Sequence, residues 1–380
     1  MSKKIGLLTF QSAVNYGAAL QMYALYRSIE KNNDNVEVID YIGSKQETDY
    51  RLFYPHNFRG NILRKIKVLL RDVLQTRYLW MKRRNFKKFL LKNIRISDPY
   101  DNLLEIPSGQ YDSIIVGSDQ VWNPKITGND FAYFLDFCKG SKRYSYAASF
   151  GSYNLLEDKK IERYKKQLEC FDKISVREQV SKDMLAEMGI KDTIVSIDPT
   201  LLLDASEWQK MEKVPKVNEK YILVYTVRSL SETGPLYKLV KELKKRTGLR
   251  VLDLSALPMP KSFAKAIATS SPDEFVGYIH GASYVITDSF HGTIFSALMH
   301  KQFLVDAIRG GHNNKKYDSR ISNLLKILNL SDRMIDPRDN KRDVLGYMNS
   351  KIDWRTTELE LKSLRSESEK YLADICEGLK

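Results

Sequence analysis

Short apolar runs rich in β-branched residues alternate along this chain with stretches that have the three- and four-residue spacing of amphipathic helices. Strand, helix and strand in this order and at this spacing are typical of parallel sheets with crossover helices. The fold class is therefore expected to be α/β. In the first block, strands are expected at residues 5–10, 36–41, 113–116, 143–147, 173–176 and 193–197.

The pattern restarts after a polar stretch at residues 212–220. Two such blocks predict two Rossmann-like, doubly wound domains, and a length of 380 residues suits two or three domains. Ligands of these sheets bind at the carboxyl ends of the strands, so the cleft between the domains is the expected site. We expect an N-terminal domain over residues 1–205, a C-terminal domain over 206–345 and a helical tail over 346–380.

The positive charge of the chain is concentrated in one segment. Of the net charge of +14, residues 59–95 supply +12, through thirteen Lys or Arg and a single acid, Asp72. Large apolar residues recur there at helical spacing, which predicts amphipathic helices. Such a helix either packs on its own domain with its charged face in water, or lies on an anionic membrane or acceptor, and both interpretations stay open. No zinc-finger spacing or RNP-like motif points to nucleic acid.

Several classes of protein are excluded by what the sequence lacks. Cys138, Cys170 and Cys376 are too few and too far apart for a disulfide framework or a cysteine zinc site. No apolar run approaches 18 residues and no long signal core follows the N-terminus, so a cytoplasmic protein is expected. The glycine-rich fingerprints of dinucleotide and NTP sites are missing, and the histidines lack metal-ligand spacing. We therefore expect neither a cofactor nor a metal.

A histidine stands where a strand passes into a helix, in Val285-Ile-Thr-Asp-Ser-Phe-His-Gly-Thr293. Ser289 is a suitable helix N-cap, and the first turn offers free N–H groups and the positive end of the helix dipole, which bind anions. Beside such an anion His291 can transfer protons near neutral pH. A histidine that packs beneath the neighbouring helix fits the same spacing.

Two other expected strand ends carry charged side chains. Arg177 follows the strand at 173–176, where its planar guanidinium could bind a phosphate or carboxylate, or pair with Glu178 or another acid. Asp119 follows a Gly-Ser turn after the strand at 113–116. Its carboxylate could orient a sugar hydroxyl or act as a base, or could merely stabilise the turn.

Residues around these strand ends complete the candidate cleft. Asn15 and Gly17 join the first strand to the first helix and permit close approach of a ligand to the backbone. Ser118, Trp122 and Asn123 lie in the stretch around Asp119.

Taken in order, these motifs resemble the polysaccharide pyruvyl transferase family over residues 4–305. Each motif is short, and the specificity comes from the ordered set. The matching pieces are Asn15-Tyr-Gly-Ala-Ala-Leu20, Val116-Gly-Ser-Asp-Gln-Val-Trp-Asn-Pro124, Tyr146-Ala-Ala-Ser-Phe-Gly151, Ile174-Ser-Val-Arg-Glu178, Asp198-Pro-Thr200 and Thr287-Asp-Ser-Phe-His-Gly292.

The resemblance implies two Rossmann-like domains in a GT-B-like arrangement, phosphoenolpyruvate as donor and a sugar as acceptor. The product would be a pyruvate ketal on a surface polysaccharide or its lipid-linked precursor, with inorganic phosphate released. The basic segment at residues 59–95 matches none of the family motifs. By its charge it could hold the enzyme near a lipid-linked, anionic acceptor at the inner face of the membrane, through peripheral contact.

The resemblance also implies roles for particular residues. His291 is the catalytic candidate, and Phe290 and Gly292 belong to the donor motif. The chemistry of its carboxylate makes Asp119 a second catalytic candidate, as the partner of the acceptor hydroxyl. Arg177 is expected to bind the donor. Some relatives have Arg-Leu-His where this chain has Ser-Phe-His, so one donor arginine is replaced by Ser289. Ser289 with the helix N–H groups, Arg228 or Arg309 could take its place.

Two other functions fit the same residues. A GT-B glycosyltransferase that uses a nucleotide sugar would share the fold and the basic helices. A non-catalytic glycan- or membrane-binding protein would not need His291 for ligand binding.

Overall fold

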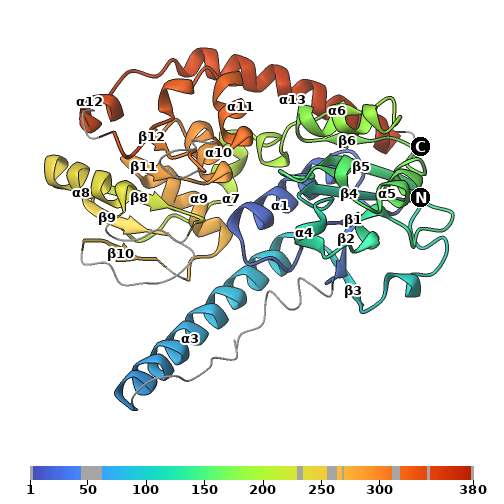
Figure 1. Cartoon of the computed structure of the whole chain (residues 1–380), viewed down its shortest axis with the longest axis horizontal. Coiled ribbons are helices and arrows are strands. Elements are labelled where there is room, and N and C mark those ends of the chain that lie inside the picture. Colours follow the sequence, from blue (N-terminus) through green and yellow to red (C-terminus); the bar gives the residue numbers. More distant parts are fainter. Residues whose placement is uncertain are drawn as a thin grey trace. The chain divides into compact units, whose positions relative to one another are not determined.

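The computed structural model divides into two compact units (Figure 1). It describes residues 3–43, 62–228, 234–254, 263–267, 269–309, 317–339 and 343–377, with the backbone alone for 62–75 and 377. The first unit comprises Met1–Arg51, Lys87–Leu203 and Ser363–Lys380, and the second comprises Leu52–Phe86 and Asp204–Lys362.

The described residues of the first unit form a seven-stranded sheet in the order β3-β2-β1-β4-β5-β6-β7, in which all paired strands are parallel. The chain order reverses between β1 and β4, as in a doubly wound Rossmann sheet. The strands are β1 (Ile5–Leu8), β2 (Val36–Tyr41), β3 (Ile96–Tyr100), β4 (Ser113–Asp119), β5 (Lys142–Ala148), β6 (Ser175–Val176) and β7 (Ile194–Val195).

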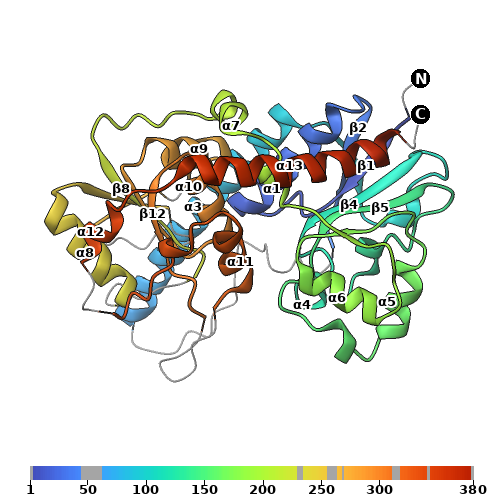
Figure 2. The same ribbon diagram turned by 90° about the horizontal axis from the view of Figure 1, so that it is seen from above.

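Helices cover both faces of this sheet (Figure 2). Right-handed crossovers require this arrangement, because the chain leaves β1 toward β2 but leaves β4 toward β5. One face carries α1 (Tyr16–Glu30) and the end of α13 (Trp354–Glu377), whose Tyr371 donates to the backbone O of Ser145 over 2.9 Å. The other carries α5 (Ile161–Leu168) and α6 (Gln179–Glu187), with α4 (Pro124–Thr127) following β4.

The second unit repeats the plan with a five-stranded parallel sheet in the order β10-β9-β8-β11-β12, counted over its described residues. Its strands are β8 (Tyr221–Tyr225), β9 (Arg250–Asp253), β10 (Lys265–Ala266), β11 (Tyr284–Thr287) and β12 (Gln302–Val305). Its helices are α7 (Ala205–Met211), α8 (Pro235–Thr247), α9 (Pro272–Gly281), α10 (Phe290–Leu298), α11 (Ser319–Ile327) and α12 (Val344–Met348).

Two segments differ from the expected domain limits. The basic segment forms one long helix, α3 (Ile62–Asn93), rather than several, and the division between the units falls within it. Residues 59–61 lie outside the described part. The tail is also divided, because residues after Lys362 belong to the first unit, where Arg365 donates to the O of Leu201 over 2.8 Å. Long helices can contribute separate turns to separate cores, which a sequence boundary does not reveal.

Candidate active site

The sequence candidates lie at the carboxyl ends of parallel strands, at or near the two places where strand order reverses. In the first unit the reversal lies between β1 and β4, which ends at Asp119. In the second unit it lies between β8 and β11, which is followed by Ser289 and His291. Open α/β sheets bind their ligands at such switch points. Arg177 directly follows β6, farther along the first edge.

The turn at the end of β4 is tightly built. Gly117 has a φ of +121°, and a Cβ there would lie 2.3 Å from the carbonyl O of Tyr146. Ser118 is fully buried, donates from Oγ to the O of Ala147 over 2.9 Å, and donates from its N–H to Gln21 Oε1 over 3.2 Å. The turn therefore holds Asp119 in the left-handed region, at a φ of +67°, at the edge of the sheet.

Arg177 is enclosed by carboxylates. Its Nη1 donates to Asp198 Oδ2 over 3.0 Å and its Nε to Glu178 Oε1 over 2.9 Å. Nη1 also lies 3.6 Å from Asp119 Oδ1. Burial opposes the charged form, but the charges of Glu178, Asp119 and Asp198 outweigh it and raise the pKa of Arg177. The salt-bridge interpretation of Arg177 therefore fits the structure better than direct binding of an anionic donor.

Asp119 differs from the other two carboxylates in what surrounds it. Glu178 also accepts from Ser149 and Ser181, and Asp198 accepts twice from Thr200. The Asp119 side chain is 18% exposed and is held by the longer contact to Arg177. With three acids around one arginine, this edge is suited to hydroxyl donors such as those of a sugar rather than to an anion.

The other expected cleft residues of the first unit are used in packing. Trp122 is fully buried, donates from Nε1 to the O of Tyr133 over 2.8 Å and stacks on Phe134. Asn123 caps α4, and Asn15 caps α1 by accepting from the N–H of Ala18 over 3.2 Å. Trp122, Asn123 and the buried Ser118 thus support the loop and do not line a cleft, which corrects the expectation for them. Gly17 is buried in the first turn of α1.

In the second unit, α10 begins directly on the sheet. Ser289 caps the helix by accepting from the N–H of Gly292 over 3.3 Å, as expected. A Cβ at Gly292 would lie 2.3 Å from Thr287 Oγ1 and 2.9 Å from Tyr225 Cδ1. Glycine is therefore required for packing at this position. The half-buried Phe290 and His291 occupy the first helical turn, with their rings 5.3 Å apart.

Arg228 follows β8 and joins the ends of three strands. Its Nε donates to Asp288 Oδ2 over 2.6 Å, and its Nη2 donates to Asp306 Oδ2, after β12, over 2.7 Å. Burial opposes its charge, but the bonds and charges of these two carboxylates raise the pKa of Arg228. It is one of the two arginines that the sequence offered in place of an arginine at Ser289.

Arg309 and Arg320 surround the same turn. Arg309 Nη2 donates to the O of Asp288, next to Ser289, over 2.8 Å, and to Asp318 Oδ2 over 3.2 Å. Arg320 donates from Nε and Nη2 to both oxygens of Asp318 and lies 5.9 Å above the ring of Phe290. Burial alone would raise the pKa of Asp318, but the bond from Arg320 and the charges of Arg320 and Arg309 lower it.

The carboxyl edge of the second sheet exposes positive charge to solvent, although its three arginines are matched by three aspartates. The side chains of Arg228, Arg309 and Arg320 are 31, 26 and 27% exposed. Their partners Asp288, Asp306 and Asp318 are buried. Together with the N-terminus of α10, the exposed guanidiniums can bind an anion that carries phosphate or carboxylate groups. His291 lies in the same turn and can handle a proton.

Sequence reasoning missed Arg320, Asp306 and Asp318. Asp306 directly follows β12, so its place at the end of an expected strand was a usable signal. Asp318 caps α11, a helix that the sequence analysis did not predict, and the capping pattern Asp318-Ser-Arg320 was therefore not connected with the site.

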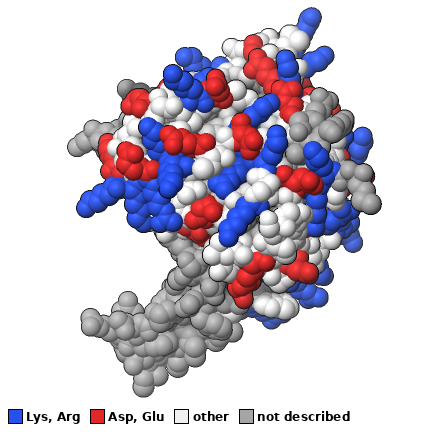
Figure 3. Space-filling model, turned by 90° about the vertical axis from the view of Figure 1, so that its right-hand side faces the viewer, with Lys and Arg blue, Asp and Glu red and all other residues white. Residues whose placement is uncertain are grey.

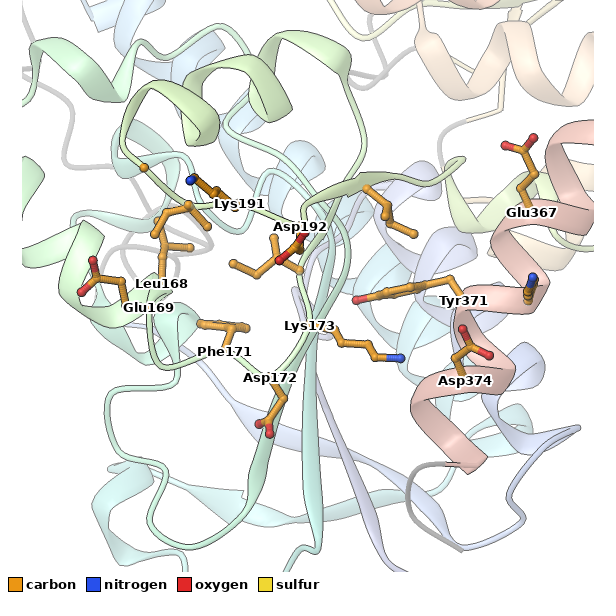
Figure 4. Close-up of a pocket in the computed structure, with 15 residues that line it drawn as sticks. Leu168, Glu169, Phe171, Asp172, Lys173, Lys191, Asp192, Glu367, Tyr371 and Asp374 are labelled. Atoms are coloured by element: carbon orange, nitrogen blue, oxygen red, sulfur yellow. The ribbon is translucent and has the colours of Figure 1, made fainter.

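A separate pocket of about 710 Å³ lies in the first unit, at the amino ends of β6 and β7 (Figure 4). Lys173, Asp192, Tyr371 and Asp374 line it. Because it lies away from the carboxyl edge, we do not assign it to the site. Within the described ranges, no three His, Cys, Asp or Glu side chains are grouped to hold a metal ion. No helix in that part of the chain is both long and apolar enough to cross a membrane.

The two units define an α/β protein of the GT-B class, and solved structures of this class are similar to it. UDP-GlcNAc 2-epimerase from Methanocaldococcus jannaschii has 12% identity over 94% of this chain and 95% of its own, with a TM-score of 0.50. Medicago truncatula UGT71G1, solved with UDP-glucose, has 10% identity over 100% and 98%, with a TM-score of 0.52. At such identities the likeness shows the fold alone. None of the curated proteins matches the chain in sequence.

The family follows from a sequence match. The family model of polysaccharide pyruvyl transferases matches residues 15–305, and the chain therefore belongs to that family. This confirms the resemblance drawn from the motifs. The family is one of transferases in polysaccharide biosynthesis and implies a sugar or polysaccharide acceptor.

Proposed function

We propose that the protein transfers the pyruvyl group of phosphoenolpyruvate to a sugar of a surface polysaccharide or its lipid-linked precursor. Two hydroxyls of one sugar form bonds to the central carbon of the donor, and the bond from that carbon to the phosphate oxygen breaks. The two hydroxyls release two protons in all. One is matched by the proton that is added to the methylene carbon, and the other leaves with inorganic phosphate. The product is a pyruvate ketal.

The exposed arginines around α10 are the observation that carries this proposal. Phosphoenolpyruvate has a phosphate and a carboxylate, and both need cations or N–H donors. Arg320 donates from Nε and Nη2 to the carboxylate of Asp318. Arg309 donates to the carbonyl O of Asp288, which is next to Ser289 in the chain. In our proposal these two arginines and the helix N-terminus bind the donor, and Arg309 takes the place of the arginine expected at Ser289.

His291 is the proposed proton-handling group. Protonation of the donor's methylene carbon makes the central carbon electrophilic, and a positioned acid or base contributes about 10²- to 10⁴-fold in rate. Asp119 is the proposed ligand for an acceptor hydroxyl, because its carboxylate is the most exposed of the three around Arg177. Arg177 then acts as a positioning residue for Asp119 instead of a donor ligand.

Thermal unfolding with phosphoenolpyruvate tests the donor without knowledge of the acceptor. A ligand at about 100 times its Kd should add about 2.7 kcal/mol to the free energy of unfolding. We expect this stabilisation in the wild type and its loss in Arg320→Gln and Arg309→Gln. The matched control is Arg250→Gln, which removes an arginine at the amino end of β9, where its partner is the exposed Glu219.

A panel of nucleotide sugars forms the competing arm of the same experiment. Stabilisation by a nucleotide sugar and none by phosphoenolpyruvate would replace the proposal with a GT-B glycosyltransferase. Equal stabilisation of the wild type and Arg320→Gln by phosphoenolpyruvate would place the donor elsewhere.

A further inference from the structure

One face of helix α3 carries large apolar side chains in water. The opposite face is buried through Phe86, Phe89 and Leu90, and Phe89 packs on Tyr23 with ring centroids 5.7 Å apart. Trp80 is 52% exposed and Leu91 is 62% exposed. The apolar side chains of the buried face are therefore covered, whereas Trp80 and Leu91 on the other face remain exposed among the described residues.

The exposed apolar residues share a stripe with basic ones. Positions 80, 84, 87 and 91 follow the spacing i, i+4, i+7 and i+11, so Trp80, Arg84, Lys87 and Leu91 lie along one side of the helix. The guanidinium of Arg84 lies 5.6 Å from the ring centroid of Trp80. An aromatic ring and a cation are thus presented together, with Leu91 about two helical turns beyond Arg84 on the same side.

The charge of this stretch has a single sign. Residues 76–95 contain no acid, whereas Lys and Arg are interspersed with Asp and Glu on the face drawn in Figure 3. Exposed bases in a stretch that contains no acid attract an anionic surface. The eight basic residues are Arg77, Lys82, Arg83, Arg84, Lys87, Lys88, Lys92 and Arg95, of which Lys82 is buried and Arg83 half-buried.

We propose that the exposed face of residues 76–95 binds the surface of an anionic phospholipid bilayer. Tryptophan prefers the headgroup level of a bilayer, and Trp80 is exposed on this face. Leu91 adds apolar area that can enter the boundary with the acyl chains, while Arg84 and Lys87 contact lipid phosphates. This combination of apolar and basic side chains on one face fits a lipid surface better than a nucleic-acid backbone. The proposal does not depend on which donor the enzyme uses.

Flotation of the full chain with vesicles tests this proposal. We expect binding to vesicles of phosphatidylcholine with 30% phosphatidylserine, and little binding to pure phosphatidylcholine. Each basic residue near such a surface changes partitioning about fivefold, so Arg84→Glu with Lys87→Glu should weaken binding more than 10-fold. Trp80→Ser with Leu91→Ser should weaken binding in low salt as well, because apolar contact is not screened.

Matched controls separate this face from general surface effects. Lys238→Glu with Lys245→Glu reverses two exposed lysines on α8, and Leu104→Ser with Val214→Ser removes two exposed apolar residues elsewhere. Both pairs should leave vesicle binding within twofold of the wild type. The proposal is overturned if the wild type ignores anionic vesicles, or if the α8 pair lowers binding as much as the α3 pair. Tight binding of single-stranded DNA or RNA with no vesicle binding would assign the face to nucleic acid instead.

Discussion

Arg177 and Asp198 form a buried ion pair in which Arg177 Nη1 donates to Asp198 Oδ2 over 3.0 Å. The two residues are 21 positions apart, one after β6 and the other after β7. Asp198 in turn accepts from the N–H and the hydroxyl of Thr200. The pair therefore ties the ends of two very short strands together, which gives Arg177 a structural role.

Removal of one partner of this pair should be costly. Arg177→Met would leave Asp198 buried and unpaired, and breaking such a pair costs about 3–5 kcal/mol. We expect that loss in urea unfolding followed by circular dichroism. The double variant Arg177→Met with Asp198→Asn should recover part of it, because the fully buried side chain at position 198 then carries no charge. A double variant as unstable as the sum of the single variants would show that the two residues do not act as a pair.

His291→Gln should separate binding from chemistry. If His291 handles the proton, turnover falls by about 10²- to 10⁴-fold, while stabilisation by phosphoenolpyruvate persists because the arginines remain. Phosphate release with a crude acceptor pool gives the rate, and thermal unfolding gives the binding. The matched control is His280→Gln in the same unit, whose histidine pairs with Glu212 and should leave turnover nearly unchanged. Full turnover by His291→Gln would remove the histidine from the mechanism.

Local patterns predicted some helices and strands closely. The expected strand 36–41 and helix 235–247 coincide with β2 and α8, and the helix expected at 178–188 lies within one residue of α6. These elements have strong periodicity and clear boundaries, such as the glycine after α8. Strand β3 was missed because Ile96-Ser-Asp-Pro-Tyr100 has little apolar character and lies at the sheet edge, where proline is tolerated.

The positions of the main candidate residues could be predicted from the sequence, but their ion-pair partners far away in the chain could not. Asp119, Arg177 and His291 were found because each follows an expected strand, a relationship that is local in sequence. The pair of Arg177 with Asp198 and the pair of Arg228 with Asp306 join residues 21 and 78 positions apart, which no local spacing reveals. The buried Trp122 was misassigned because a sequence does not show whether an aromatic ring faces a cleft or a core.

Gly292→Ala should destabilise the second unit and weaken donor binding together. The added methyl would lie 2.3 Å from Thr287 Oγ1, so the start of α10 has to move, and overpacking of this kind costs about 1–3 kcal/mol. Calorimetry with and without phosphoenolpyruvate measures both effects. Adding Thr287→Ala removes the nearest clashing atom and should restore part of the stability. An unchanged melting temperature for Gly292→Ala would show that the turn is not tightly packed.

Lys82 should make stability depend on pH in an alkaline window. Burial lowers its pKa from 10.5 to about 8, so between these values the unfolded chain holds a proton that the folded chain has lost. Stability therefore rises with pH across this window, and the cost of burying the charge is greatest below pH 8. Each pKa unit corresponds to about 1.4 kcal/mol, which sets the cost at about 3 kcal/mol or less.

Lys82→Met removes that cost, so it should stabilise the protein at pH 7 and lose its advantage as the pH approaches 10.5. Urea unfolding at several pH values measures the difference in the free energy of unfolding between the variant and the wild type. The effects of other titrating groups cancel in this difference. Lys87→Met, an exposed lysine on the same helix, is the control and should show no such trend. A gain for Lys82→Met that is equal at pH 7 and pH 10 would mean that packing, rather than the buried charge, sets the stability at this position.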